Sequence, residues 1–463
     1  MGGGLAVSGM AYPSSVAAVS RVSASDKIRF GILGLGGRNL FLIQEFLKNP
    51  EVEIAYICDV DKRRWQGGFD AVSGKENFGY THTSASRYEP GYTARKGQEK
   101  KPEAVQDFRR MLDDPDVDAL VISPGSHWGP LATIMACQAG KDVYLEKPFS
   151  HDIYEGRKTI EAARKYGRVV QIGSQNRSAP YIKNAVDYIR SGKLGEVRYV
   201  RVLNMLDGQR GAPGPYPAKP VPTEFDYDMW CGPAPKRAYN PKKTAPGVWR
   251  YFWEYSGSDS ESIHQVDVAR WVVGQAYPRS VHSVGRVSFP DRLADLPDTL
   301  STIYDYGDVT LSFDLTWWTP YMIKSPRETV RHGDQFPHWP LNGTRIEIYG
   351  REGTMMLGRH GGGWQVWGPD GEEGPSEYGR MAVPEHIQDF LNCIKSRKKP
   401  NADIEVAQYS QAIIHMAYIS YRLGNRQLNF DGASERFIGD DEANQYIGRP
   451  NRGRAPWKIP KEV

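Results

Sequence analysis

A glycine cluster between a predicted strand and a predicted helix constrains the fold of this chain more than any other feature. Residues 27–33 (KIRFGIL) are apolar enough for a buried parallel strand. Gly34 then allows a tight turn, and Gly36 lets the backbone approach a pyrophosphate at the unpaired N–H groups of a helix N-terminus. Asn39 replaces the third glycine of the usual pattern, so we expect the helix to lie slightly farther from the strand. The alternative is an ordinary tight turn.

A second predicted strand strengthens the dinucleotide interpretation. Residues 52–58 (VEIAYIC) end in Asp59, at the spacing of the acidic residue that binds a ribose 2′-hydroxyl. A carboxylate there repels a 2′-phosphate, which favours NAD over NADP. Arg38, Arg63 and Arg64 oppose this preference, because each side chain could reach a phosphate. The alternative role of Asp59 is to cap the following helix.

Three more strand patterns follow, and they alternate with helical patterns. Residues 117–123 lead into Pro124, residues 142–145 lead into Glu146-Lys147-Pro148, and a sixth strand is predicted over 168–173. Alternating strands and helices predict an open parallel sheet of the α/β class, in which ligands bind beyond the carboxyl ends of the strands. Pro124 and Lys147 therefore fall at the ligand-binding edge.

Length, charge and cysteine spacing exclude several classes. A chain of 463 residues suits two domains. A net charge of +4 without a basic block argues against nucleic acid as a partner, and the absence of any run of 18 apolar residues argues against a membrane span. The four cysteines lack C-x-x-C spacing, so neither a metal site nor a disulfide framework is predicted.

Several motifs together resemble one known family. They are Gly34-Leu35-Gly36-Gly37-Arg38, Asp59, the Ser-Pro-x-x-His run at 123–127, Glu-Lys-Pro at 146–148, Gly-Ser-Gln at 173–175, and His264 with Asp267. On these residues the chain resembles the Gfo/Idh/MocA family, the glucose-fructose oxidoreductase and inositol dehydrogenase group. The resemblance covers roughly residues 27–435.

The resemblance implies a Rossmann domain over 27–177 and an α/β domain over 178–435. The second domain would have a large, open, mostly antiparallel sheet that packs in oligomers, so we expect a homodimer or homotetramer. Residues 436–463 are expected to be a C-terminal tail. Strand patterns separated by turn signals agree with such a sheet: 196–203, 280–287, 299–306, 309–315 and 345–349. Helical periodicity follows over 386–395 and 406–423.

Two segments lie outside this layout. Residues 1–26 are rich in small residues, and Val22-Ser23-Ala24 resembles a cleavage site, so we expect an exported, periplasmic protein whose native leader carries an arginine pair upstream. The alternative is a disordered tail of a cytoplasmic protein. Residues 81–101 are polar and are expected to be a solvated insertion, with a lid or an oligomer contact as the alternative.

The resemblance also implies where NAD binds, with NADP the less favoured cofactor. The expected cofactor-binding residues are Gly34, Gly36, Gly37, Arg38, Asp59, Ser123, Pro124, His127, Glu146, Lys147 and Gln175. Lys147 is also the first candidate for the general base. A lysine at its reference pKa of about 10.4 is a poor base, but a nearby cationic nicotinamide lowers that pKa, while Glu146 acts in the opposite direction. The alternative role of Lys147 is a phosphate or ribose contact.

His264 is the second catalytic candidate. Its imidazole titrates near neutral pH, so it can exchange a proton with the substrate oxygen and with Lys147. The family often has an aspartate four residues before this histidine, whereas this chain has Ser260 there, with Asp259 and Glu261 on either side. That departure casts doubt on a mechanism like that of inositol dehydrogenase.

Four further residues are substrate-binding candidates. Trp249 and Arg250 belong to an aromatic cluster that suits a sugar ring, although core packing explains aromatic residues as readily. Arg177 follows the sixth strand and faces the cofactor by analogy. Asp267 lies one helical turn after His264 and could orient it, with a structural carboxylate as the alternative.

We therefore predict an NAD-dependent oxidoreductase that acts on a hydroxyl group of a sugar, polyol or glycoside, without a metal ion. The first alternative is a redox-neutral glycosidase that keeps NAD bound, oxidises a sugar hydroxyl, cleaves the glycosidic bond and returns the hydride. The second is a non-catalytic protein that binds NAD.

Overall fold

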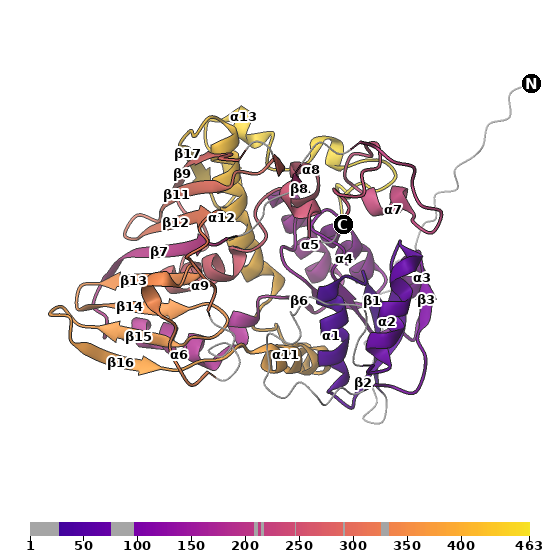
Figure 1. Cartoon of the computed structure of the whole chain (residues 1–463), viewed down its shortest axis with the longest axis horizontal. Helices are drawn as coiled ribbons and strands as arrows, with labels where there is room; N and C mark the ends of the chain where they lie inside the picture. Colours follow the sequence, from indigo (N-terminus) through magenta and orange to yellow (C-terminus); the bar gives the residue numbers. More distant parts are fainter. Residues whose placement is uncertain are drawn as a thin grey trace, which may run out of the picture.

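Two separate β-sheets organise the computed structural model (Figure 1). It describes residues 27–75, 97–207, 212–213, 217–245, 247–289, 292–325 and 333–463. The leader expected over 1–26 and most of the insertion expected over 81–101 lie outside these residues.

The first sheet has six parallel strands, which confirms the predicted Rossmann domain. The strands are β1 (Ile28–Leu33), β2 (Val52–Cys58), β3 (Glu103–Val105), β4 (Ala119–Ile122), β5 (Asp142–Leu145) and β6 (Val170–Ile172). Their order in the sheet is β3-β2-β1-β4-β5-β6. The order in which strands are added to the sheet therefore reverses between β1 and β4, where the carboxyl ends of the two parallel strands leave room for a ligand.

Helices cover both faces of this sheet, which is why its central strands are mostly apolar. Every residue of β4 and β5 is buried. The helices are α1 (Gly37–Leu47), α2 (Trp65–Val72), α3 (Arg109–Asp113), α4 (Gly129–Gln138) and α5 (Ile153–Lys165).

The second sheet has ten strands and is mostly antiparallel, as predicted. They are β7 (Val197–Met205), β9 (Ser280–Arg286), β11 (Thr299–Asp305), β12 (Thr310–Thr316), β13 (Arg345–Gly350), β14 (Gly353–Gly358), β15 (Trp364–Trp367), β16 (Glu373–Glu377), β17 (Leu428–Asp431) and β18 (Arg436–Phe437). Their order is β16-β15-β14-β13-β7-β12-β11-β9-β17-β18. Only the β7–β12 pair is parallel among these pairings. A separate short sheet pairs β8 (Ala212–Pro213) with β10 (Arg292–Leu293).

Helices cover one face of the second sheet (Figure 1). They are α6 (Pro180–Arg190), α9 (Ile263–Val273) and α12 (Ile404–Arg422). Among them, α12 also packs against α5 and β6 of the Rossmann domain. The other face is open, so β11 alternates buried and exposed residues, and Ile303 is 44% exposed. Within the described ranges, no helix combines the length and apolar character needed to cross a membrane.

Two late segments of the chain pack on the Rossmann domain. Helix α11 (Val383–Ser396) lies against α1, and the Phe390 and Phe30 ring centroids are 6.3 Å apart. The segment expected to be a tail also packs, because the Trp457 ring meets the Trp128 ring at 5.1 Å and Ile459 is fully buried. The C-terminal segment therefore belongs to the core of the first domain.

Replacement of Trp457 by alanine tests this packing. The indole is 9% exposed, so we expect Trp457→Ala to lower the free energy of unfolding by about 3–5 kcal/mol, the usual cost of truncating a buried aromatic side chain. Urea unfolding followed by circular dichroism measures the change. Lys461→Ala, an exposed site in the same segment, is the control and should change stability by less than about 0.5 kcal/mol. Equal unfolding curves for the two variants would contradict the assignment.

Candidate active site

The glycine loop between β1 and α1 can receive a pyrophosphate. Gly34 has a φ of 87°, in the left-handed region that favours glycine. Gly36 is the N-cap of α1, and no atom lies within 4 Å of where its Cβ would be, so the helix N-terminus is accessible. Asn39 donates hydrogen bonds to the carbonyl oxygens of Leu33 (2.8 Å) and Gly34 (2.7 Å). Asn39 thus ties the helix to the loop where a third glycine would have allowed close packing.

Asp59 braces this loop as well as lining the cavity beside it. Its carboxylate accepts hydrogen bonds from the backbone N–H groups of Leu35 at 2.8 Å and Asp61 at 2.9 Å, and burial raises its pKa. The cap of the following 3-10 turn is Asp61, which also forms an ion pair with Arg63 at 2.7 Å. Each Asp59 oxygen keeps a second lone pair that a ribose hydroxyl can use.

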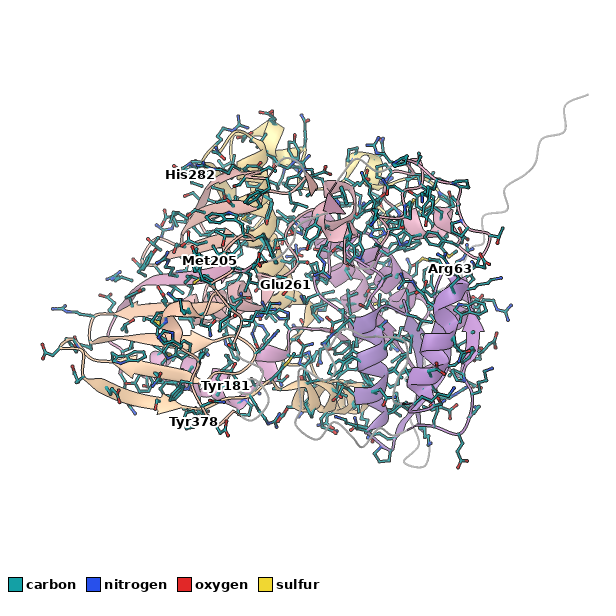
Figure 2. The ribbon with its side chains drawn as sticks, viewed as in Figure 1. Arg63, Tyr181, Met205, Glu261, His282 and Tyr378 are labelled. Carbon is teal, nitrogen blue, oxygen red and sulfur yellow. The ribbon has the colours of Figure 1, made fainter. Side chains whose placement is uncertain are left out.

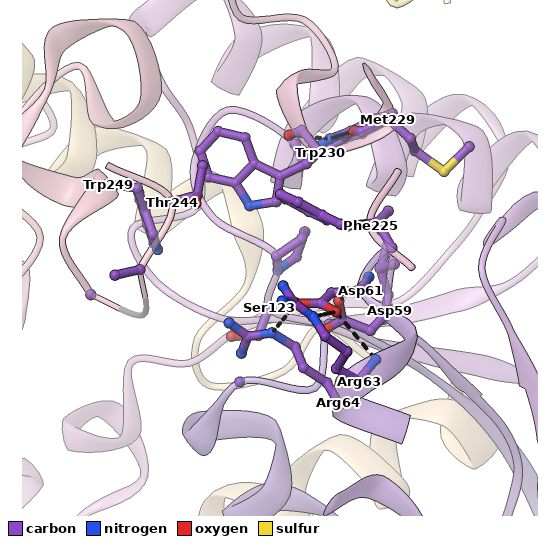
Figure 3. A pocket seen from close by; sticks show the side chains of 18 of the residues that line it. Asp59, Asp61, Arg63, Arg64, Ser123, Phe225, Met229, Trp230, Thr244 and Trp249 are labelled. Carbon is purple, nitrogen blue, oxygen red and sulfur yellow. Dashed lines mark hydrogen bonds and ion pairs between the residues drawn. The ribbon is translucent and has the colours of Figure 1, made fainter. Parts of the chain in front are cut away.

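A cavity of about 550 Å³ lies beyond the strand ends (Figure 3). Rossmann residues form one wall, and Phe225, Trp230 and Trp249 of the later chain face them from the other side. Nine of the predicted site residues line it: Gly34, Gly36, Gly37, Arg38, Asp59, Ser123, Pro124, Trp249 and Arg250. The cavity therefore joins the predicted cofactor residues to the predicted aromatic cluster.

The second wall is attached to the Rossmann domain by backbone hydrogen bonds. The Lys62 N–H donates to the Glu224 carbonyl at 3.0 Å, and the Asp226 N–H donates to the Val60 carbonyl at 2.9 Å. His127 lies behind this wall, is 1% exposed, and does not line the cavity. Its Nε2 is 2.9 Å from the Trp230 carbonyl oxygen, and burial lowers its pKa to about 3. His127 is therefore corrected from a cofactor contact to a residue that holds the wall.

Glu146 connects the glycine loop to the last strands of the sheet. Its carboxylate accepts hydrogen bonds from Arg38 Nε at 2.8 Å and Gln175 Nε2 at 3.4 Å. A Cβ on Gly173 would lie 2.6 Å from that carboxylate, so only glycine leaves room for it. Arg38, Glu146 and Gln175 thus act as one hydrogen-bonded group, and Gln175 positions Glu146 instead of facing the cavity.

Lys147 is buried at the end of β5 and points across the domain boundary. Its Nζ donates a hydrogen bond to the Ser260 carbonyl oxygen at 2.9 Å. Burial lowers the pKa of Lys147 to about 8; Glu261 raises that pKa, whereas Arg359 and Arg250 lower it. The sequence predicted a lowered pKa from a bound nicotinamide, but the protein alone already produces it.

Glu261 lies between the two domains and collects three cations (Figure 2). Its carboxylate forms ion pairs with Arg359 Nη2 at 2.9 Å, Lys324 Nζ at 3.3 Å and Arg250 Nη1 at 3.4 Å. Burial raises the pKa of Glu261, but the surrounding cations, Lys324 and Lys147 first, bring it well below its usual value. Glu261 is therefore ionised under all ordinary conditions.

His264, on α9, meets a second histidine that follows β14. The ring centroids of His264 and His360 are 4.0 Å apart in an edge-to-face arrangement. Burial, the His360 ring and the charges of Lys147 and Arg359 lower the pKa of His264 well below its usual value. Burial and the Arg359 charge likewise lower the pKa of His360 well below its usual value. Both imidazoles are neutral near pH 7, so His264 acts as a neutral hydrogen-bonding group and a weak base.

Arg177 and Asp267, predicted at the substrate, instead bind each other. Their side chains form a buried ion pair at 2.8 Å, with exposed fractions of 6% and 1%. Asp267 also accepts a hydrogen bond from the Ser410 hydroxyl at 2.6 Å. The pair joins the end of the Rossmann domain to α9 and α12, and no hydrogen bond from Asp267 to His264 occurs among the described residues. This corrects both assignments to a structural role.

Models of two domains from one oxidoreductase family match the chain. An oxidoreductase-family NAD-binding Rossmann fold matches residues 28–174, and the family's C-terminal alpha/beta domain matches 213–296 and 378–459. The chain belongs to the Gfo/Idh/MocA family.

Relatives within this family are oxidoreductases, several of them named dehydrogenases. The chain is 24% identical to the uncharacterized oxidoreductase YrbE of Bacillus subtilis, covering 71% of this chain and 73% of YrbE. It is 25% identical to scyllo-inositol 2-dehydrogenase (NAD(+)) of Bacillus subtilis, covering 55% of this chain and 58% of that enzyme. The WlbA dehydrogenase of Bordetella pertussis, crystallised with NADH and UDP-GlcNAcA, has the same fold, with a TM-score of 0.59, 20% identity, and coverage of 88% of this chain and 99% of WlbA.

The sequence motifs shared with the Gfo/Idh/MocA family did not predict several residues of this site. Ser260 occupies the position where the family often has aspartate, and the charge next to it, on Glu261, gathers cations from distant segments. His360 has a φ of 50°, and Gly361, Gly362 and Gly363 continue in positive φ. The triple glycine was the available signal, since such a turn presents the preceding Arg359 and His360 to the site.

Unpaired polar atoms gather at this point among the residues that the structure describes. Protein interiors rarely leave buried polar atoms without partners, so a cluster of them indicates a ligand site. They are Arg250 Nε, Ser260 Oγ, His264 Nδ1, Arg359 Nη1 and His360 Nε2. All five belong to residues in or beside the Lys147–Glu261 group.

The lowered pKa of Lys147 predicts a pH profile. A general base at Lys147 would remove a proton only when the amine is neutral, so we expect kcat/KM for alcohol oxidation to fall as pH drops below about 8 and to level off above it. Initial rates of NADH formation at saturating NAD, measured from about pH 6 to 10, give the profile. Lys147→Gln is the control and should lose the step near pH 8. A step near pH 8 that persists in the variant would assign the titration to another group.

Proposed function

We propose that this protein is an NAD-dependent oxidoreductase that transfers a hydride between a hydroxyl-bearing carbon of a sugar, polyol or glycoside and the nicotinamide. The observation that carries the proposal is Lys147, a buried amine with a pKa of about 8 beside a cluster of unpaired donors and acceptors, one of which, Arg250, also lines the dinucleotide cavity. A group that is neutral near working pH and still basic is what removal of a hydroxyl proton requires.

Different residues of the site would bind the cofactor and accept the proton. Gly34, Gly36 and the N-terminus of α1 fit a pyrophosphate, and Asp59 fits a ribose hydroxyl. Bound there, the nicotinamide supplies the hydride acceptor. Lys147 Nζ takes the proton from the substrate hydroxyl, and the Ser260 carbonyl holds Nζ in place. Burial of the group excludes water and keeps the amine basic but neutral.

Three observations support a carbohydrate or polyol as substrate. The relative scyllo-inositol 2-dehydrogenase is named for a polyol. In this chain, the neutral His264 and His360 rings each have an unpaired nitrogen, which suits hydrogen bonds to hydroxyl groups. Trp249, on the cavity wall, offers a flat surface for a sugar ring.

Mass spectrometry of the purified protein followed by a sugar and glycoside panel tests the proposal. NADH formation with free sugars or polyols supports it. Cleavage of aryl glycosides by enzyme with bound NAD, without added cofactor, would select the redox-neutral glycosidase instead. Intact NAD binding with neither reaction would select the non-catalytic alternative.

Replacement of Lys147 tests its catalytic role. We expect Lys147→Ala to reduce turnover by about 10² to 10⁴, the usual contribution of positioned acid–base catalysis, while NAD affinity stays within about threefold. Steady-state rates and calorimetry of NAD binding measure both. His264→Ala should reduce turnover less, and the double variant should be little slower than Lys147→Ala, because groups acting as one unit are not additive. Undiminished turnover in Lys147→Ala would contradict the mechanism.

Cofactor selectivity provides a separate prediction. Asp59 and Asp61 place two carboxylates beside the cavity, and Asp61 forms an ion pair with Arg63, which keeps that arginine from binding a 2′-phosphate. We therefore expect NAD to bind at least about tenfold tighter than NADP, equivalent to about 1.4 kcal/mol. Calorimetry with both nucleotides measures the ratio. Asp61→Ala releases Arg63 and should narrow the preference. Equal or tighter binding of NADP by the unchanged protein would refute the prediction.

A further inference from the structure

Three cations share the Glu261 carboxylate, because Arg250, Lys324 and Arg359 each form an ion pair with it. The nearby Asp259 carboxylate accepts hydrogen bonds from the Glu261 and Ser262 N–H groups. The ion pairs of Glu261 therefore hold a surplus of cations over carboxylates. Lys147 adds to the surplus whenever it is protonated. The two histidines add none, because both are neutral near pH 7. Like charges this close repel strongly when partly buried, so the surplus requires a counter-charge.

The geometry of Arg359 shows where that counter-charge would bind. Its side chain is 6% exposed, yet only Nη2 is paired with Glu261, and Nη1 is buried without a hydrogen-bond partner among the described residues. A buried guanidinium with one free N–H edge is a common binding site for a carboxylate or phosphate oxygen. Lys324 is 49% exposed and Arg250 is 32% exposed, so a ligand can reach the cluster from solvent.

Two other charged groups near the site have no such surplus. Arg38 is paired with Glu146 at 2.8 Å, and Arg177 is paired with Asp267 at 2.8 Å. The Arg38–Glu146 pair belongs to the glycine-loop side, where the pyrophosphate would bind. Arg250 lines the cavity next to the glycine loop, whereas Lys324 and Arg359 come from the second domain and do not line that cavity.

We propose that the substrate carries an anionic group, a carboxylate or a phosphate on the sugar, which binds to Arg359, Lys324 and Arg250 while the reacting hydroxyl faces Lys147. This inference rests on the proposed function for the hydroxyl chemistry but not for the binding of the anion. It narrows the substrate class from neutral sugars and polyols to sugar acids and sugar phosphates.

Matched substrates that differ by one group test the proposal. The NAD-loaded enzyme is given D-glucose, D-glucuronate and D-glucose 6-phosphate, and likewise D-galactose and D-galacturonate, and kcat/KM is measured from NADH formation. We expect at least one anionic member to exceed its neutral parent by about tenfold or more, and the ratio to fall with added salt, since the cations are partly exposed. Preference for the acid or for the phosphate distinguishes the two sources of the anion.

Two variants connect the preference to these residues. Arg359→Gln should lower the anionic-to-neutral ratio by about tenfold or more, and Lys324→Gln, at a half-exposed site that tolerates substitution, should lower it by a smaller factor. Arg426→Gln is the control, because Arg426 pairs with Asp440 and Glu442 on the surface. It should leave the ratio unchanged.

Binding separates failure of this inference from failure of the proposed function. Calorimetry of the same sugars with the NAD-loaded enzyme that shows anion binding dependent on Arg359, without NADH formation, would reject the oxidoreductase proposal and support the anion site. Neutral sugars that bind and react as well as their acids and phosphates would overturn the anion site alone. Equal loss of the neutral and anionic substrates in Arg359→Gln, or no binding of any anionic sugar, would overturn it as well.

Discussion

The arrangement of this site depends on the burial of one amine, that of Lys147. An ammonium group removed from water loses solvation, and the structure compensates only in part, through the Ser260 carbonyl at 2.9 Å and the negative charge of Glu261. Arg359 and Arg250 act against that compensation. The result is an amine with a pKa of about 8, because burial outweighs the compensation from Glu261.

The Rossmann half of this arrangement was predictable because its residues follow strand ends. Asp59 directly follows β2, and Glu146 and Lys147 directly follow β5, so the predicted strands place them at one edge of the sheet. Gly34 has a local backbone reason to be glycine, its positive φ, whereas Gly36 leaves open space beside the N-terminus of α1. In each case a few neighbouring residues decide the position, and the pattern of apolar runs is sufficient to find it.

The substrate half could not be predicted, because distant segments build it and side-chain directions decide it. Glu261 precedes α9, Lys324 follows β12, and Arg359 follows β14, so the cluster forms only when the second sheet packs against α9. The same packing turns Arg177 and Asp267 toward each other. Spacing along a helix shows that Asp267 is near His264, but not that an arginine 90 residues earlier pairs with it.

The surplus of positive charge links the choice of substrate to the strength of the base. Arg250 and Arg359 lower the pKa of Lys147, and an oxidised nicotinamide does so further, which favours the neutral amine but weakens it as a base. An anion bound beside Arg359 has the opposite effect and raises that pKa. The neutral imidazoles of His264 and His360 do not offset either change, because both stay unprotonated at this pH. If the proposed anion binds there, the pKa of Lys147 during turnover would depend on the charge of the substrate as well as on the cofactor, and a neutral sugar would meet a weaker base than an anionic one.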